Sequence, residues 1–485
     1  MKFLWFILSL SFFFLTNQAS AEVPNLPWRL LYLSAPVQVL PFSPGLTAPI
    51  RPLGWSIPDS VQLTLIGLRQ SGTLHRPLDP TTQNSGIFSF VGRRHLSPHQ
   101  LLYFQVQYAT WQQQGVARAI ELEPYADDPL VLQDSTDGNF QHGWLQFSTQ
   151  YFHRLGKRWI PFVGVYYQVG QGLKNQYTRP RILRRSFQWQ SGIQWQLSPH
   201  WQWIFTFQGL QWQEQTEIEK SRIDFQDPLV YRFRSAGVYR PFLGEFTRYV
   251  TLTQYTGWIA MRWVGRMTIA LTGMQEHMVT IDRTTLEFPD TPWYRQGFSV
   301  FLKTAQWSLF PKLQLILRAT GGHRSGWSQH PAYPLLIMER TVQWATVTAT
   351  TFWQRLAARF PYVAVRLRWH YLSDQAMHYQ KHISEQGILH QFQLRVNTGW
   401  KINPIRQIGG QFYYGMTTQP QASLRFFPEF EEIGIGFHFQ EQRATHQWRS
   451  SLNVRYFWNR TTSWHRWVTF LKITVGFQLP PGKGK

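Results

Sequence analysis

The sequence has no cysteine, few acidic residues and, beyond its first residues, no long hydrophobic run. Without cysteine it cannot form a disulfide scaffold, a thiolate zinc site or a cysteine nucleophile. Asp and Glu number 26 against 48 Lys and Arg, which gives a formal net charge of +22 over 485 residues. Each membrane-spanning helix needs about 20 mostly apolar residues, so a mean hydropathy of −0.31 excludes a protein built of several such helices.

Aromatic residues, in contrast, are abundant. Phe, Trp and Tyr make up 16% of the chain, with 24 Trp and 36 Phe. A disordered chain is poor in aromatic residues, so this composition indicates a folded protein. The longest stretch without charge, Ser186–Gln213, is rich in Gln and Ser and cannot be a helix embedded in lipid.

Residues 1–21 have the pattern of a secretory signal. Lys2 is followed by the apolar run Phe3–Leu15 and then by small residues at Ala19-Ser20-Ala21, which predicts cleavage before Glu22. The alternative is an N-terminal membrane anchor, for which the run is short. An exported chain without a spanning helix is either soluble outside the cytoplasm or a β-barrel in an outer membrane.

Residues 22–60 differ from the rest because they hold eight prolines. This density forbids central strands. We predict either an extended periplasmic lead into the first strand or a partial plug that folds back into the lumen, followed by a barrel over residues 61–485. The apolar residues that a plug could bury are Leu30, Leu31, Val37, Val39 and Leu40.

A period of two is clearest in residues 187–197. The odd positions there are mainly Phe, Trp, Ile and Leu, and the even positions are Gln or Gly. This alternation puts the large groups on one face of a strand. Ser198-Pro199-His200 predicts a turn, and the alternation resumes from Trp201 to Gln208, so the segment predicts a hairpin of two long strands.

The same period recurs to the C-terminus. Its strands run to about 10–15 residues, longer than the 5–6 usual in globular proteins and long enough to cross a membrane as barrel strands. The connections alternate between tight ones, at 198–200 and 403–406, and long polar ones. The long connections are expected at Thr216–Ser235, Thr280–Thr291, Gly321–Ile337 and Leu372–Glu385. Short periplasmic turns and longer outer loops are typical of outer-membrane barrels.

We therefore predict an all-β fold, an antiparallel transmembrane β-barrel of about 14–18 strands. A soluble propeller is the main alternative, but a propeller would show a repeat of about 40–50 residues, which the chain lacks. Amphipathic aromatic rings suit the interface between lipid tails and headgroups. The aromatic residues expected there, at strand ends, are Trp144, Tyr151, Trp159, Tyr166, Trp353, Trp369, Trp458 and Trp467.

Residues 101–181 carry a further pattern. Glu123-Pro124-Tyr125 and the run Val131–Gly138 precede a strand pair that ends in Gln176–Arg181. This segment resembles an uncharacterised outer-membrane β-barrel family of Bacteroidota. Asp137 stands where that family has the first Gly of a turn, and the Asp-Pro that opens its Arg-Pro-Arg segment is replaced. The resemblance implies a barrel in an outer membrane and implies no particular activity.

The basic residues are mainly arginine, which outnumbers lysine 37 to 11 and suits bidentate contact with phosphate and carboxylate. Several fall on the face opposite the apolar stripe, and a charge facing lipid costs about 2–4 kcal/mol at the midplane, so we expect them in the lumen. The candidate anion contacts are Arg318, Arg366, Arg368, Arg395, Lys401, Arg449 and Arg455. A positive lumen concentrates anions. The alternative is that these side chains pair with the few luminal acids and fill the interior.

No motif of a hydrolase, a metalloprotease or a nucleotide-binding protein occurs. We predict no catalytic residues, no metal site and no cofactor. The acidic turn at 134–137 is too sparse for a calcium loop. His378 and His382 are four residues apart, with His370 and His390 nearby, but they fall in an expected loop and are interpreted as solvent-exposed.

Three functions remain open. The first is a passive pore or uptake barrel for polar or anionic solutes, which would not be an enzyme. The second is a structural or assembly barrel with a closed lumen, and the third, less favoured, is an outer-membrane hydrolase. A TonB-dependent transporter is disfavoured, because the 464 residues after the signal do not readily supply about 22 strands and a folded plug.

The expected location is the outer membrane of a Gram-negative bacterium. The expected partners are outer-membrane lipid, lipopolysaccharide and small anionic or polar solutes. Nucleic acid is not an expected partner, because a barrel offers a duplex no basic helix or stacking sheet.

Overall fold

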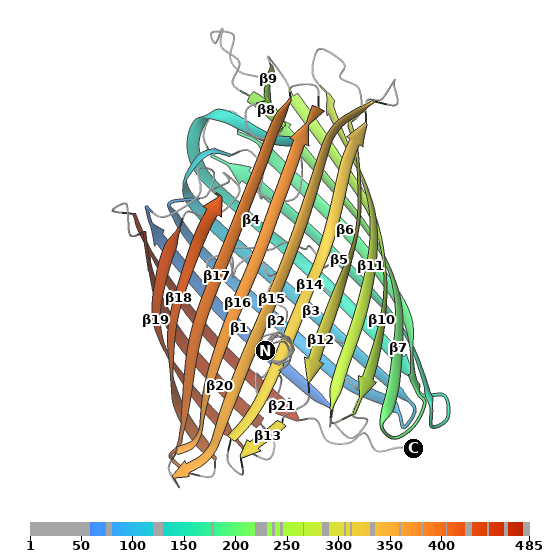
Figure 1. Ribbon diagram of the computed structural model, residues 1–485, viewed down its shortest axis with the longest axis vertical. Helices are drawn as coiled ribbons and strands as arrows, with labels where there is room; N and C mark the ends of the chain where they lie inside the picture. Colours follow the sequence, from blue (N-terminus) through green and yellow to red (C-terminus); the bar gives the residue numbers. More distant parts are fainter. Residues whose placement is uncertain are drawn as a thin grey trace, which may run out of the picture.

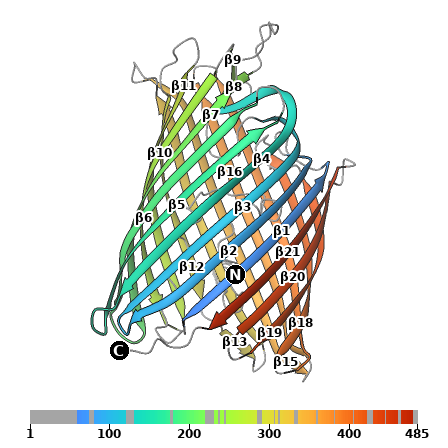
Figure 2. The same ribbon diagram turned by 180° about the vertical axis from the view of Figure 1, so that it is seen from behind.

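The chain forms one antiparallel sheet that closes into a barrel (Figures 1 and 2). The computed structural model describes residues 59–73, 80–119, 130–175, 179–218, 230–234, 238–242, 246–264, 266–283, 291–304, 307–310, 313–329, 335–357, 360–379, 382–403, 405–421, 429–443, 446–459 and 464–478. The predicted signal peptide, and the predicted lead up to residue 58, lie outside these ranges and stay predictions.

The strands of the sheet follow one another along the whole described chain. They are β1 (Ser60–Gly72), β2 (Thr82–Ser97), β3 (Gln100–Ala119), β4 (Leu130–His153), β5 (Trp159–Lys174), β6 (Arg181–Gln196), β7 (Trp201–Ile218), β8 (Val230–Arg234), β9 (Val238–Phe242), β10 (Phe246–Trp263), β11 (Met267–Arg283), β12 (Thr291–Thr304), β13 (Trp307–Phe310), β14 (Leu313–Gln329), β15 (Leu336–Ala357), β16 (Phe360–His378), β17 (Ile383–Lys401), β18 (Arg406–Gln421), β19 (Phe430–Gln442), β20 (His446–Trp458) and β21 (His465–Gln478). Among the described residues, no helix is long and apolar enough to cross a membrane.

Eighteen of these strands make the ring. Strands β8, β9 and β13 lie outside it, because β7 pairs directly with β10 and β12 pairs directly with β14. The ring closes where β1 pairs with β2 on one side and with β21 on the other. A closed ring leaves no strand edge unpaired, as a lipid environment requires. The predicted antiparallel barrel of about 14–18 strands is confirmed.

The two faces of the wall differ as the period of two predicts. In β6, Phe187 and Trp189 are exposed, whereas Gln188 and Gln190 between them are buried. The apolar stripe therefore points outward, where it meets lipid, and the glutamines point into the barrel. The same outward exposure recurs around the ring, at Leu145 of β4 and Leu471 of β21.

Tight turns join the strands at one end of the barrel, which we call the short-turn end. The Ser198 hydroxyl accepts hydrogen bonds from the backbone N–H groups of His200 and Trp201 at 3.2 and 3.1 Å. The Asn403 carbonyl oxygen does the same for Ile405 and Arg406 at 3.0 and 2.7 Å. Both predicted tight turns are therefore present, each held by the side chain that opens it.

Longer connections join the strands at the opposite end, which we call the long-loop end. The longest runs from 219 to 245 and contains the hairpin β8–β9. Strand β8 pairs with the first residues of β4, a strand of 24 residues that rises above its neighbours (Figure 2). The predicted asymmetry between short turns and longer loops is confirmed.

Two of the four predicted long loops are mostly strand in the structure, so these two predictions are wrong. Strand β14 runs on to Gln329 and β15 begins at Leu336, so most of Gly321–Ile337 is strand. Likewise β16 ends at His378 and β17 begins at Ile383, within the expected loop Leu372–Glu385. These strand segments carry polar residues on both faces. Pairing continues there without the alternation that a lipid-covered segment must show.

A belt of tryptophan lies on the outer face near the short-turn end. Trp159 of β5 stacks on Trp195 of β6 with ring centroids 5.1 Å apart, and Trp201 of β7 stacks on Trp263 of β10 at 5.2 Å. Trp203 lies opposite Trp195 in the register and continues the row. This arrangement matches the aromatic girdle at one membrane interface of a barrel.

The expected placement of aromatic residues at the membrane interface is confirmed for some residues and wrong for others. Trp159 and Trp467 are exposed on the outer face, but Trp144 and Tyr166 are buried. Both have the parity of the inner-facing residues, and the Tyr166 hydroxyl donates to Gln146 at 3.4 Å. Their interpretation as interface residues is wrong, because closeness to a strand end says nothing about which face a side chain occupies.

A charge introduced into this wall should cost more stability on the face that meets lipid than on the inner face, even at neighbouring residues. Phe207 points outward and is exposed, and Gln208 beside it is buried on the inner face. We expect Phe207→Arg to lower the free energy of unfolding by about 2–4 kcal/mol, because a cation then faces hydrocarbon. Urea titration of folding into lipid vesicles measures this loss. The matched variant Gln208→Arg should cost clearly less, and equal losses would contradict the assignment of the two faces.

Candidate functional site

The strand register brings several of the predicted basic residues together on the inner face. Lys303 of β12 lies opposite Arg318 of β14, and Thr348 of β15 lies between Arg318 and Arg368 of β16. Directly opposed residues of antiparallel strands share a face. The row continues through β11 and β10 to Gln202, which is buried on the inner face of β7. All these cations therefore point into the barrel.

A second row lies beside the first. Arg366 of β16 is opposite Arg395 of β17, which is opposite Tyr413 of β18. Gly434 of β19 follows, and it faces Arg455 of β20. Because Gly434 has no side chain, Arg455 reaches across it to the Tyr413 ring. Its guanidinium carbon lies 4.2 Å from the ring centroid.

Tyr413 thus has one arginine on each side. The Arg395 guanidinium lies 5.0 Å from the same ring centroid and donates from Nε to Asn397 at 2.9 Å. Cation–π contact and this hydrogen bond hold the two guanidinium groups in fixed positions. The Tyr413 hydroxyl donates to Asn453 at 3.3 Å, which in turn fixes the ring.

The positive charges are close enough to repel one another. Arg366 is within electrostatic range of Arg395, Arg318 and Arg368. Its Nε donates to the hydroxyl of Thr350 at 3.3 Å, a neutral partner that supplies no counter-charge. Four guanidinium groups on neighbouring strands therefore form an arrangement that a bound anion would stabilise.

Among the described residues, Glu432 of β19 is the carboxylate recorded beside this group. It is buried and accepts a hydrogen bond from Gln393 at 3.2 Å. Arg455 lies 3.8 Å away and Arg368 is within electrostatic range. One carboxylate shared between two arginines leaves the group with a net positive charge.

The remaining predicted residues take separate places. Arg449 and Lys472 lie on the inner face of β20 and β21, two positions apart in the register, and within electrostatic range of each other. Lys401 is the last residue of β17, and its side chain lies outside the described part. We call the set Arg262, Lys303, Arg318, Arg366, Arg368, Arg395, Arg449, Arg455 and Lys472 the basic wall.

Arg262 and Lys303 are members of the basic wall that sequence reasoning missed. Each is the last residue but one of its strand, β10 and β12, beside the short turns. Strand ends look like turns in a sequence, so their face is hard to assign. Their parity with the inner-facing residues of their own strands is the signal that would have found them.

The charges of the inner face are distributed unevenly along the barrel axis. Close to the long-loop end, arginines are paired with carboxylates. Arg248 donates to Asp282 at 2.7 and 3.1 Å, and Arg340 donates to Asp374 at 2.8 Å. The other such pairs are Arg184 with Glu214 and Arg295 with Glu276.

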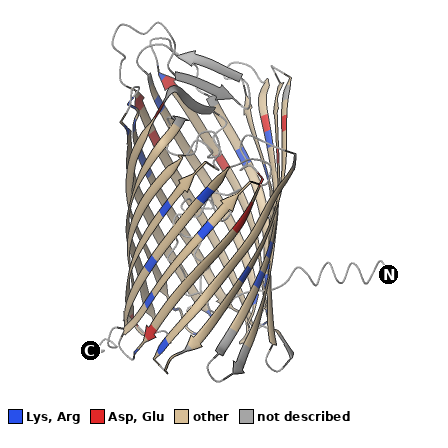
Figure 3. Ribbon diagram, turned by 90° about the vertical axis from the view of Figure 1, so that its left-hand side faces the viewer, with Lys and Arg blue, Asp and Glu red and all other residues tan. Residues whose placement is uncertain are grey.

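The basic wall, in contrast, begins beside the short turns and climbs obliquely with the tilted strands. Figure 3 shows acidic segments mainly toward the end that carries β8 and β9, while basic segments continue down the wall. Charge is therefore balanced at the long-loop end and largely unbalanced below it, which is an arrangement that attracts anions inward.

The four histidines do not share one exposed loop, although His382 is exposed in the turn between β16 and β17, as expected. His370 and His378 are buried on β16, and the His370 Nδ1 lies 2.6 Å from the Thr346 hydroxyl. Their interpretation as solvent-exposed is wrong because β16 extends through the expected loop. Within the described ranges, no group of three His, Asp or Glu side chains is placed to hold a metal ion.

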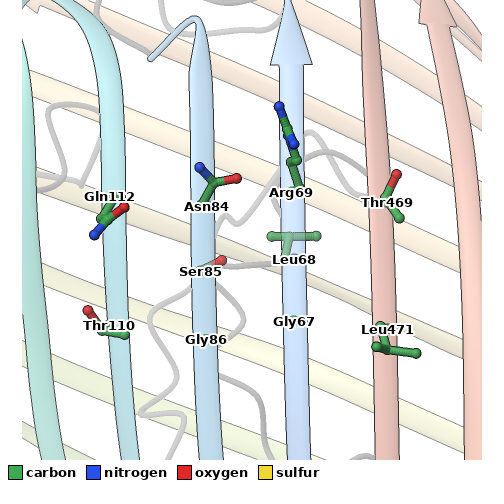
Figure 4. Close-up of a pocket in the computed structure, with 10 residues that line it drawn as sticks. All are labelled: Gly67, Leu68, Arg69, Asn84, Ser85, Gly86, Thr110, Gln112, Thr469 and Leu471. Carbon is green, nitrogen blue, oxygen red and sulfur yellow. The ribbon is translucent and has the colours of Figure 1, made fainter.

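A hollow of about 400 Å³ indents the outer surface over β1, β2, β3 and β21 (Figure 4). Gly67 and Gly86 form its floor, because neither carries a side chain, and Arg69 is the charged residue among those that line it. It opens away from the basic wall. The expected contact with lipopolysaccharide phosphate at such a surface stays a prediction.

The chain matches one family model and is similar in fold to solved outer-membrane structures. The model of a family described as a family of unknown function (DUF6850) matches residues 54–484. No curated protein matches the chain. The barrel is similar to BauA, the ferric preacinetobactin receptor of Acinetobacter baumannii, with a TM-score of 0.39 and 9% identity over 87% of this chain and 80% of that one.

Two further solved structures are similar to a comparable degree. The outer membrane transporter YddB from Escherichia coli has a TM-score of 0.40 and 7% identity over 86% of this chain and 80% of that one. The copper transporter OprC has a TM-score of 0.43 and 7% identity over 86% and 80%. The strand pairing of this chain itself establishes the fold.

Proposed function

This chain belongs to the DUF6850 family, a family of unknown function, and from that premise we propose that it is an outer-membrane barrel that admits polar and anionic solutes passively. The observation that carries the proposal is the basic wall, in which cations outnumber the neighbouring carboxylate. The proposed location is the outer membrane of a Gram-negative bacterium, reached through cleavage of the signal at residues 1–21. Lipid and lipopolysaccharide are its proposed surroundings.

The physical reason is the cost of holding like charges together. Guanidinium groups that share one wall repel one another unless counter-charge is supplied, and a phosphate or carboxylate of a solute supplies it. The alternative, in which luminal acids neutralise the arginines, is supported at the long-loop end by the pair of Arg248 and Asp282. It is not supported at Arg366, whose Nε donates to the neutral hydroxyl of Thr350.

The first test is ion selectivity of the full chain in a planar bilayer. In a tenfold gradient of potassium chloride, we expect a reversal potential of the sign that indicates chloride as the more permeant ion, because the wall is positive. A reversal potential that indicates preference for potassium would overturn the proposal. Before this measurement, outer-membrane preparations are run on SDS gels with and without boiling. A heat-dependent change in migration establishes that the barrel is folded and located in the outer membrane.

The second candidate is a structural barrel with a closed lumen. The observation that favours it is apolar burial on the inner face, for example at Trp144 and Phe162. This candidate predicts no conductance from any variant of the chain, whereas the first predicts an anion-selective current. No residue arrangement in the described part favours the hydrolase.

A further inference from the structure

Part of the inner face is apolar, in a position where an open channel would be polar. A cluster of buried side chains gathers there from strands on both sides of the closure between β1 and β21. Its members are Ile66, Leu68, Ile87, Ala109, Trp111, Trp144, Phe430, Phe457 and Val468. We call this cluster the inner apolar patch.

The strand register shows that the patch faces the lumen. Ile66 lies opposite Ile87, which lies opposite Ala109, which lies opposite Trp144. Leu65, the residue before Ile66, points the other way and is 55% exposed on the outer surface. A strand presents successive residues to opposite faces, so this row belongs to the inside of the barrel.

These side chains are nevertheless almost completely shielded from water. Ile66 is 4% exposed and Ala109 is 0% exposed. A single sheet covers a side chain only from below and from the sides. A ring of 16–18 strands is also too wide for its own side chains to fill, unlike a ring of about eight. A second layer over the patch on its lumen side accounts for this burial, and an apolar patch favours an apolar cover.

We propose that the cover is the N-terminal segment of this same chain, residues 22–58, folded back into the lumen as a plug. The segment enters the barrel at Asp59, directly before β1, the strand that carries Ile66 and Leu68. Its eight prolines prevent it from joining the ring as a strand. Its apolar residues Leu30, Leu31, Val37, Val39 and Leu40 supply the surface that the patch lacks.

The segment is long enough. An extended proline-rich chain spans about 3.1 Å per residue, so the 19 steps from Leu40 to Asp59 reach up to about 59 Å. Ile66 lies seven residues along β1 from Asp59, a distance of about 23 Å at 3.3 Å per residue. The chain can therefore turn back at the short-turn end and place Leu40 on the patch with length to spare.

This inference goes beyond the proposed function, because it concerns access to the lumen and holds for any solute. A plug on the patch occupies the side of the lumen where β1 and β21 meet. The basic wall runs across β10 to β21 and adjoins the patch where Arg455 and Phe457 share β20.

The absence of cysteine makes a direct test possible, since any introduced thiol is unique. The full chain with Ile66→Cys is compared with the same chain in which Leu30, Leu31, Val37, Val39 and Leu40 are all replaced by Ser. We expect a charged, membrane-impermeant maleimide to label Cys at position 66 at least about tenfold faster when the lead is polar, because the cover no longer binds. Equal labelling rates would overturn the proposal.

Two controls separate this result from unfolding. A lead in which Asn25, Ala35, Gln38, Thr47 and Ala48 are replaced by Ser carries as many substitutions and should leave position 66 protected. Leu65→Cys, on the outer face, should label at one rate with all three leads. Each variant must keep the heat-dependent gel migration of a folded barrel.

A second measurement identifies the occupant. Leu40→Cys combined with Ile66→Cys should give an intramolecular product with a flexible bis-maleimide, whereas Leu40→Cys combined with Leu65→Cys should not. If no cross-link to position 66 forms from cysteine at position 30, 37 or 40, the cover is an outer loop or another protein and the proposal fails. Anion selectivity is measured separately on the polar-lead variant, so the plug and the anion path can fail independently.

Discussion

Replacing both Arg366 and Arg368 by Gln is expected to lower the preference for chloride over potassium about threefold to tenfold. A unit charge about 10 Å from the path of an ion contributes between about 0.4 and 1.7 kcal/mol, depending on the effective dielectric constant. Both side chains belong to the basic wall. Arg366 is within electrostatic range of Arg395, Arg318 and Arg368, and Arg368 shares the carboxylate of Glu432 with Arg455. The measurement is the reversal potential in a potassium chloride gradient, for the variant and the parent protein side by side.

The matched control removes one positive and one negative charge, so the net charge of the inner face stays the same. Arg184→Gln combined with Glu214→Gln deletes a buried ion pair near the long-loop end, where Nε of the arginine donates to the carboxylate at 2.8 Å. It also contains two substitutions to Gln on the inner face, but net charge stays constant, so selectivity should not change. If both double variants shift selectivity equally, the effect comes from altered shape and the basic wall is not the selective element.

Replacing Arg248 by Met is expected to lower the free energy of unfolding by about 3–5 kcal/mol. Arg248 and Asp282 form a bidentate pair whose side chains are almost fully buried. Removing the arginine leaves an uncompensated carboxylate out of contact with water, which is among the most destabilising changes available in a protein. Denaturant titration of the folded barrel in lipid vesicles measures the loss.

The double variant Arg248→Met, Asp282→Leu provides the comparison. Replacing both members of a buried pair by apolar residues is often close to neutral, so this variant should recover most of the lost stability. A double variant as unstable as Arg248→Met alone would show that packing around Arg248, and not the isolated carboxylate, causes the loss.

Several features could be read from residues that are close together in the sequence. The alternation of Phe187, Gln188 and Trp189 assigned the faces of β6 correctly, and Ser198 and Asn403 marked the turns that they hold. These features depend on the two-residue period of a strand and on local hydrogen bonds. Strand length and the alternation of short and long connections then indicated a barrel.

The errors arose where the period of two carries no information. Beyond the lipid, β14 and β16 have polar residues on both faces, so their outer parts looked like loops and His378 looked exposed. Trp144 and Tyr166 were assigned by their closeness to strand ends, which does not determine the face. The matching family is one of unknown function, which is consistent with the resemblance to an uncharacterised family, while the Bacteroidota source stays a prediction.

The sequence by itself determined that this chain forms a barrel, because membrane-crossing strands must alternate and each alternation is local. It also placed Arg366, Arg395 and Arg455 on polar faces. Only the tertiary structure decided that these arginines are neighbours on β16, β17 and β20, that Arg248 meets Asp282, and that Ile66, Ala109 and Trp144 form one patch. Such contacts depend on the register and closure of the ring, which join residues far apart in the chain, and no local pattern encodes them.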